Sequence, residues 1–181
     1  MLRYLPGTTI ETNLAKNEAK KILDNIFSTG GLVLSQVSQL AGVEPYTVQN
    51  WVKRGFLKPP ISKKYTREQF CRIITINMLK DCLHINEVAR LLRYVNGNLR
   101  DDSDDVIDDD ELYLMLVDVL RRIDSFSEDV ALASIEKTLD GYVEKTVGVS
   151  RRLEKALMIM TCAYFSAQYS KKATVYLGTL E

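Results

Sequence analysis

Four polar side chains recur between residues 45 and 54 at the spacing of one helix face. Tyr46, Gln49, Asn50 and Lys53 stand at positions i, i+3, i+4 and i+7. The amides of Gln49 and Asn50 suit an adenine edge, whereas Lys53 and Tyr46 suit guanine or phosphate. The pattern therefore predicts a helix whose outer face reads bases in a major groove; the alternative is an ordinary solvated helix face.

Flanking residues predict how this helix is held. Its other face carries Val48, Trp51 and Val52, which are expected to pack on a preceding short helix that Ser35 would cap. Gly42 would supply the turn between the two helices, because glycine reaches left-handed backbone angles without a steric cost. The segment is therefore expected to form a helix-turn-helix.

The next elements follow in close succession. The stretch 61–65 carries Lys63 and Lys64 beside an aromatic residue and is expected to form a short wing against the DNA backbone. Thr66 would cap a third helix, and Asn86 a fourth helix over residues 87–94. Two further helix-turn-helix signals are Pro45, which suits a first helical turn, and Gly55, which would end the second helix.

Charge is unevenly distributed although 24 basic and 24 acidic residues cancel. Residues 50–80 hold eight basic residues and one acid, whereas residues 101–140 hold fourteen acids and three bases. Such asymmetry indicates that the basic part of the chain binds a polyanion and that the acidic part does not contact it. Seven aspartates between 101 and 110 predict an extended loop, with mimicry of DNA as an alternative role.

The segment 34–94 resembles the MerR-type winged helix-turn-helix over about one third of the chain. The resemblance rests on Thr47-Val48, Trp51, Gly55-Phe56-Leu57-Lys58-Pro59, Lys63, Tyr65 and His84-Ile85-Asn86-Glu87-Val88. It implies a DNA-binding fold and adds Thr47 to the expected contacts. The family's Arg-Tyr pair is replaced by Gln49-Asn50, the wing is shorter, and the long dimerisation helix and the metal-binding cysteines have no counterpart.

Two further resemblances keep other roles open. Thr47-Val48 followed by residues 51–55 is also similar to excisionase-like helix-turn-helices. The whole chain resembles an uncharacterised bacterial family in which a MerR-like start precedes an acidic helical tail.

The fold class expected is mainly α, with helices at 14–27, 112–123, 127–139 and 150–169 besides those above. Asn13 would cap the first of them. The expected organisation is an N-terminal helical extension (1–31), a winged helix-turn-helix (32–98), an acidic linker (99–111) and a helical dimerisation or effector domain (112–181).

Other chemistries find little support. The chain has one histidine, His84, and its proximity to Cys82 is a weak metal signal without a second pair; no cofactor and no enzymatic activity are expected. The three cysteines are expected to be buried and reduced. The uncharged, largely apolar stretch of residues 156–169 is too short to span a bilayer, and a cytoplasmic location is expected.

These observations predict a sequence-specific, bacterial-type transcription regulator. Double-stranded DNA is the expected ligand, the protein is expected to be a homodimer joined by its C-terminal helices, and RNA polymerase is a further candidate partner. The alternatives are a protein-interaction adaptor or anti-regulator with a degenerate helix-turn-helix, or an excisionase-like architectural DNA binder. The expected DNA contacts are Tyr46, Thr47, Gln49, Asn50, Lys53, Lys58, Lys63, Lys64 and Arg67.

Overall fold

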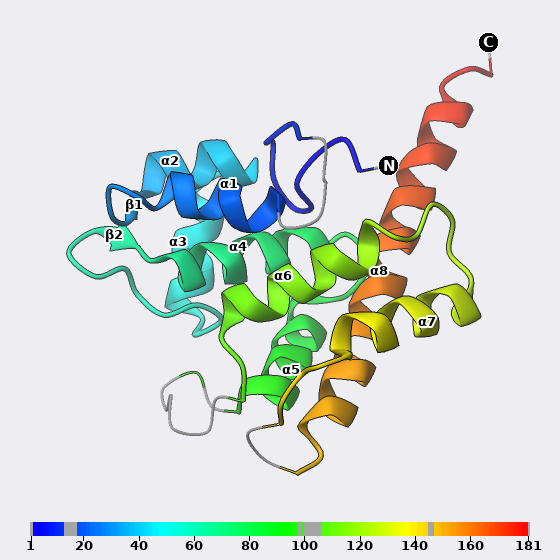
Figure 1. Ribbon diagram of the computed structural model, residues 1–181. Helices are drawn as coiled ribbons and strands as arrows, with labels where there is room; N and C mark the ends of the chain where they lie inside the picture. The colour runs from blue at the N-terminus through cyan, green and yellow to red at the C-terminus, as the bar shows by residue number, and fades with distance from the viewer. Residues whose placement is uncertain (1, 13–17, 98, 100–105, 145–146, 181) are drawn as a thin grey trace.

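The computed structural model describes residues 2–12, 18–97, 99, 106–144 and 147–180. Within these residues the chain forms eight helices and two short strands, so the mainly helical class is confirmed (Figure 1). The expected cap Asn13 and most of the aspartate run lie outside the described residues. The elements are α1 (Glu18–Ile26), β1 (Leu32–Val33), α2 (Leu34–Ala41), α3 (Pro45–Lys53), β2 (Lys64–Tyr65), α4 (Arg67–Leu79), α5 (Ile85–Asn96), α6 (Asp109–Leu120), α7 (Glu128–Leu139) and α8 (Val149–Leu177).

Helices α2 and α3 are joined by a three-residue turn that needs a glycine. Gly42 has φ +63° and ψ +36°, a left-handed conformation that is costly for a residue with a Cβ. Pro45 opens α3, where its missing N–H costs no hydrogen bond. The expected cap Ser35 is wrong: α2 begins at Leu34, so Ser35 lies inside its first turn, and the Gln36 side chain accepts a hydrogen bond from the Val33 N–H (3.0 Å).

The two strands form a small antiparallel sheet in which Leu32 pairs with Tyr65 and Val33 pairs with Lys64. A tight hairpin turn precedes β2: the N–H of Ile61 and the N–H of Lys64 each donate to the other residue's carbonyl at 2.9 Å. The two central residues, Ser62 and Lys63, have φ +50° and +63°. Positive φ at both central positions is the signature of the type I′ hairpin turn.

Helix α4 is the centre of the structure and is buried on nearly every side. Thr66 caps it as predicted, because its hydroxyl accepts from the Gln69 N–H at 3.2 Å while the Gln69 side chain accepts from the Thr66 N–H at 2.9 Å. The predicted cap Asn86 of the next helix is wrong. Helix α5 begins at Ile85, and the His84 imidazole accepts from the Asn86 N–H at 3.3 Å.

The C-terminal helices share one hydrophobic core with the N-terminal elements. Helix α6 packs along α4, and its fully buried Tyr113 donates a hydrogen bond to the Pro6 carbonyl at 2.7 Å. The expected linker 99–111 differs from the structure at its end, since Asp109 to Glu111 form the first turn of α6. The prediction that all three cysteines are buried holds for Cys71 and is wrong for Cys82 and Cys162, which are exposed.

Helix α8 runs for 29 residues across the other C-terminal helices. Its first two thirds pack against α5, α6 and α7, while its last turns project from the body (Figure 1). The sequence pattern predicted that this helix would end at 169, eight residues too early. In the described part of the chain, no helix combines the length and hydrophobicity of a transmembrane span.

Candidate nucleic-acid interface

Helix α3 has one face in the core and one in solvent. Val48 and Trp51 are buried, at 0% and 6% exposure, and they anchor the helix against the core. Tyr46 is 74% exposed, and Gln49 and Lys53 are exposed as well. Asn50, also expected on the outer face, is half-buried, as is Thr47, which the resemblance added to the expected DNA contacts. The predicted anchoring and outer faces are therefore confirmed for Val48 and Trp51 and for Tyr46, Gln49 and Lys53, whereas Val52 is half-buried like Asn50.

A groove separates α3 from the hairpin turn. It has a volume of about 470 Å³, and we call it the α3–hairpin groove. Its lining consists of Leu34, Gln49, Val52, Lys53, Pro60, Lys63 and Tyr65. The floor is mostly apolar, and the polar lining groups are one amide, two ammonium groups and a phenol. Among the residues that line this groove, all of which the structure describes, none is acidic.

The lysines around the groove are not neutralised by nearby carboxylates. Lys53, Lys63 and Lys64 are exposed, and none of them makes an ion pair with any residue that the structure describes. Lys63 stands at the tip of the hairpin turn, and Lys53 lies at the end of α3. An anion entering the groove would therefore meet two ammonium groups from opposite walls.

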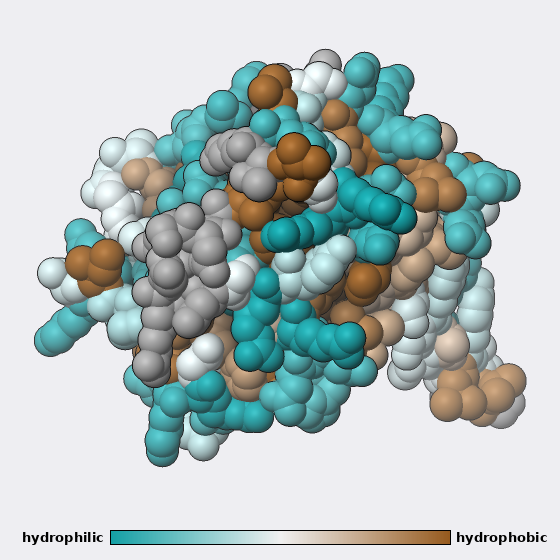
Figure 2. Space-filling view, turned by 90° about the horizontal axis from the view of Figure 1, so that it is seen from below, coloured by the Kyte–Doolittle hydropathy of each residue, from teal (hydrophilic) through white to brown (hydrophobic). Residues whose placement is uncertain are grey.

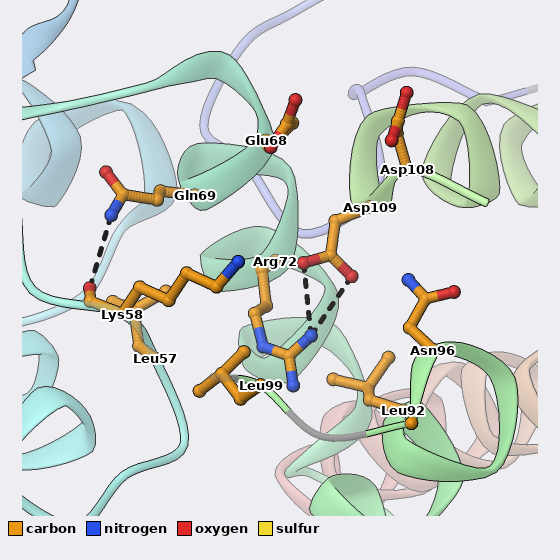
Figure 3. Close-up of a pocket in the computed structure, with 11 residues that line it drawn as sticks. Leu57, Lys58, Glu68, Gln69, Arg72, Leu92, Asn96, Leu99, Asp108 and Asp109 are labelled. Carbon is orange, nitrogen blue, oxygen red and sulfur yellow. Dashed lines mark hydrogen bonds and ion pairs between the residues drawn. The ribbon is translucent and has the colours of Figure 1, made fainter. Parts of the chain in front are cut away.

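Two of the predicted DNA contacts lie elsewhere. The guanidinium of Arg67 pairs with Asp110 at 2.7 Å and also with Asp24, and its side chain is only 23% exposed. Lys58 lines a small cavity of about 40 Å³, and the carboxylates of Glu68, Asp108 and Asp109 line the same cavity (Figure 3). The structure therefore brings Gln49, Lys53 and Lys63 together and does not bring Lys58 or Arg67 to them.

The cavity beside Lys58 contains a buried ion pair that sequence reasoning missed. Arg72, 6% exposed, donates from Nη1 to both carboxylate oxygens of Asp109 at 3.1 Å (Figure 3). Its Nε donates to the Phe56 carbonyl at 3.0 Å. Phe56 lies just beyond the end of α3, so one guanidinium ties the exit of α3 to the start of α6. The signal that could have found it is a lone arginine within the apolar run of α4.

Carboxylates crowd around this ion pair. Burial, followed by the charges of Asp108, Asp110 and Asp109, raises the pKa of Glu68 above its ordinary value, while Lys58 acts in the opposite direction. The cluster is thus an acidic surface next to a buried arginine. It lies apart from the α3–hairpin groove, and the two surfaces share no lining residue.

The fold and the surface together define a mainly helical protein that exposes a lysine-bearing helix and hairpin. Residues 22–116, just over half of the chain, match the family described as "Domain of unknown function (DUF1836)", and the protein belongs to this family. The chain is 31% identical to "Uncharacterized protein YkrK" of Bacillus subtilis (strain 168) over 85 residues. That match spans 44% of this chain and 36% of YkrK, so the chain covers about a third of that relative's length. No solved structure matches the chain.

Proposed function

We propose that the protein is a sequence-specific DNA-binding regulator in which α3 enters the major groove. The observation that carries the proposal is the α3–hairpin groove, where Gln49 and Lys53 on the helix face Lys63 on the turn across an apolar floor. An exposed helix with amides and lysines suits base edges and phosphates. The order of α2, α3, the hairpin and α4 supports a winged helix-turn-helix of MerR-like type.

The groove suggests how the contacts are divided. Tyr46, Gln49 and Asn50 lie along α3 and are the candidates for base contacts, with Thr47 beside them at the helix start. Lys53, Lys63 and Lys64 are the candidates for phosphate contacts. A sugar–phosphate strand fits between helix and turn, since the deoxyribose is apolar and its phosphates would meet the two lysines. We leave Lys58 and Arg67 out of this set because both lie next to carboxylates.

A single reading helix buries limited area on DNA. Specific sites for such modules are therefore usually read by two copies on a two-fold sequence. We accordingly propose a homodimer as the binding form. No substrate chemistry is invoked, because the proposed role is binding and regulation.

Selection of sites from random duplexes by the purified protein tests the proposal. We expect an enriched sequence with two-fold symmetry, whose affinity falls steeply as salt rises because neutralised phosphates release counterions. Gln49→Ala is expected to relax the base preference at one position of each half-site. Lys63→Ala is expected to weaken all duplexes about equally.

Lys137→Ala is the matched control, because Lys137 is also exposed but lies on α7, away from the groove. It should leave both affinity and sequence preference unchanged. Absence of binding to any duplex in dilute buffer would refute the proposal. Equal effects of Lys63→Ala and Lys137→Ala would refute the assignment of the groove.

A further inference from the structure

The projecting end of α8 presents an apolar surface without a partner in the described structure. Every residue from 168 to 180 is exposed, including Val175 (68%), Tyr176 (60%), Leu177 (66%) and Leu180 (78%). In Figure 2 this end of the chain stands out from the body and carries hydrophobic atoms. A helix segment that buries nothing gains little stability from its own sequence, so its extension beyond the body calls for a covering partner.

Part of the exposed apolar surface of this segment forms a seam, whereas Val175 and Leu177 lie to either side of it. Tyr169, Ala173 and Tyr176 are spaced four and three residues apart along α8, which is the spacing of helices that pair side by side, and Leu180 follows four residues later in the turn just beyond the end of the helix. At 100° per residue the three helical residues fall within about 60° of one another around the helix. No acidic residue occurs between 156 and 180, and the charges on the projecting part are Lys171 and Lys172.

The seam is complementary to itself when two copies run antiparallel. With the two-fold axis between residues 174 and 175, Tyr169 faces Leu180 of the second copy, and Ala173 faces its Tyr176. In this register each tyrosine faces a smaller side chain of the second copy, either leucine or alanine. A parallel pairing would instead place Tyr176 against Tyr176 and Ala173 against Ala173, which leaves one position crowded and one empty.

A socket for the partner's helix end lies at the base of the projection. Phe165 and Tyr169 form an aromatic pair, with ring centroids 6.2 Å apart, and Phe126 packs on Phe165 at 5.9 Å. Phe165 and Tyr169 line a groove of about 390 Å³ with residues from the N-terminus, from the turn after α6 and from α8 itself. Tyr169 lies about 12 Å along the helix from its last residue, Leu177, and Leu180 follows in the turn beyond it, so the antiparallel register brings each copy's Leu180 to the other's socket.

We propose that the projecting end of α8 binds a second copy of this chain, as an antiparallel pair about a two-fold axis near residue 174. Such a pair is isologous, so socket and helix end are used twice. It buries on the order of 600 Å² per copy, at the lower end for specific interfaces, and for so small a surface we expect a weak dimer with a dissociation constant on the order of micromolar. The need for two copies on DNA rests on the proposed function, whereas the surface rests on the geometry of α8.

Sedimentation of the full chain without DNA tests the interface. The wild-type protein is expected to sediment as a dimer at about 50 micromolar, well above the expected dissociation constant. Tyr176→Glu should raise that constant by more than about 100-fold, because it removes two aromatic rings from the apolar seam of each dimer and puts two carboxylates in their place. Thr174→Glu is the matched control: it adds the same charge to the same exposed helix on the side away from the seam.

Disulfide trapping tests the register. The exposed Cys82 and Cys162 are first replaced by serine. In this background a mixture of the Tyr169→Cys and Leu180→Cys proteins is expected to form a covalent heterodimer on oxidation, whereas each protein alone should remain uncrosslinked. Crosslinking of each protein with itself, and not in the mixture, would overturn the antiparallel arrangement.

A wild-type monomer at that concentration, or equal loss of dimer in Tyr176→Glu and Thr174→Glu, would overturn the interface. So would a monomer that binds anionic vesicles through this helix. Failure of the DNA proposal looks different: the protein would dimerise normally and bind no duplex. Conversely, a Tyr176→Glu protein that is monomeric but still binds a half-site weakly would support both proposals.

Discussion

Replacing Lys63 by glycine should make the protein more stable and a poorer DNA binder at once. Lys63 occupies the second central position of a type I′ turn with φ +63°. This conformation costs an L-residue with a side chain roughly 1–2 kcal/mol, whereas glycine adopts it freely. Glycine also gains about 0.5–1 kcal/mol of entropy in the unfolded chain. The expected net gain in the free energy of unfolding is therefore about 0.5–1 kcal/mol.

Thermal unfolding followed by circular dichroism measures the first half of this prediction. A gain of that size corresponds to a rise in Tm of about 1–4 °C for a domain of this length. Lys63→Ala is the control, because alanine removes the ammonium group but keeps the left-handed strain. Its Tm should stay within about 1 °C of the wild-type value.

Salt titration of DNA binding measures the second half. Each phosphate contact contributes about 0.9 to the slope of log affinity against log salt, so a dimer that loses two contacts should have a slope smaller by about 1.8. Between about 50 and 200 mM salt, the wild-type protein should then lose roughly 12-fold more affinity than either variant. A Lys63→Gly protein less stable than Lys63→Ala would refute the turn assignment, and unchanged slopes would refute the phosphate contact.

Three further substitutions test the structure that supports the groove. Asp109→Ala should lower the free energy of unfolding in urea by about 3–5 kcal/mol, because it leaves the Arg72 guanidinium buried and unpaired. Tyr113→Phe should cost about 1–3 kcal/mol in the same assay, since the Pro6 carbonyl would lose its buried donor. The raised pKa of Glu68 means that its contribution to stability is favourable below the unfolded-state pKa and is lost as pH rises through the folded-state pKa. Glu68→Gln should therefore raise Tm at about pH 7 and leave it nearly unchanged at about pH 3, where both forms are neutral; a lower Tm at neutral pH would contradict this.

Elements with local signals could be predicted from the sequence. Thr66 and Ser127 each precede a helix and accept a hydrogen bond from the backbone N–H three residues later. Pro45 and Gly42 mark the start of α3 and the end of α2 in the same local way. The alternation of buried and exposed residues along α3 follows from its apolar spacing alone. These signals lie within one helical turn of the feature that they predict.

The misplaced start of α6 has a cause that lies far away in the sequence. Repulsion within the aspartate run favours a loop, but Asp109 is paired with Arg72, 37 residues earlier. Asp110 is likewise paired with Arg67. Carboxylates in a first helical turn are further stabilised by the helix dipole. Only the packing of α6 on α4 brings these groups together, and the local sequence carries no sign of it.

The same pairing explains how a chain without net charge can present a cationic surface. Arg67 and Arg72 on α4 are matched by carboxylates of α1 and α6, and Lys80 pairs with Asp81. Two carboxylates of the acidic segment, Asp109 and Asp110, are thus paired with the arginines of α4. The lysines of α3 and the hairpin, Lys53, Lys63 and Lys64, make no such pair with any residue that the structure describes. The positive potential of these lysines is therefore not cancelled within the described structure and can attract a polyanion to the groove. For the proposed function, the distribution of charge over the fold matters more than the net charge of the chain.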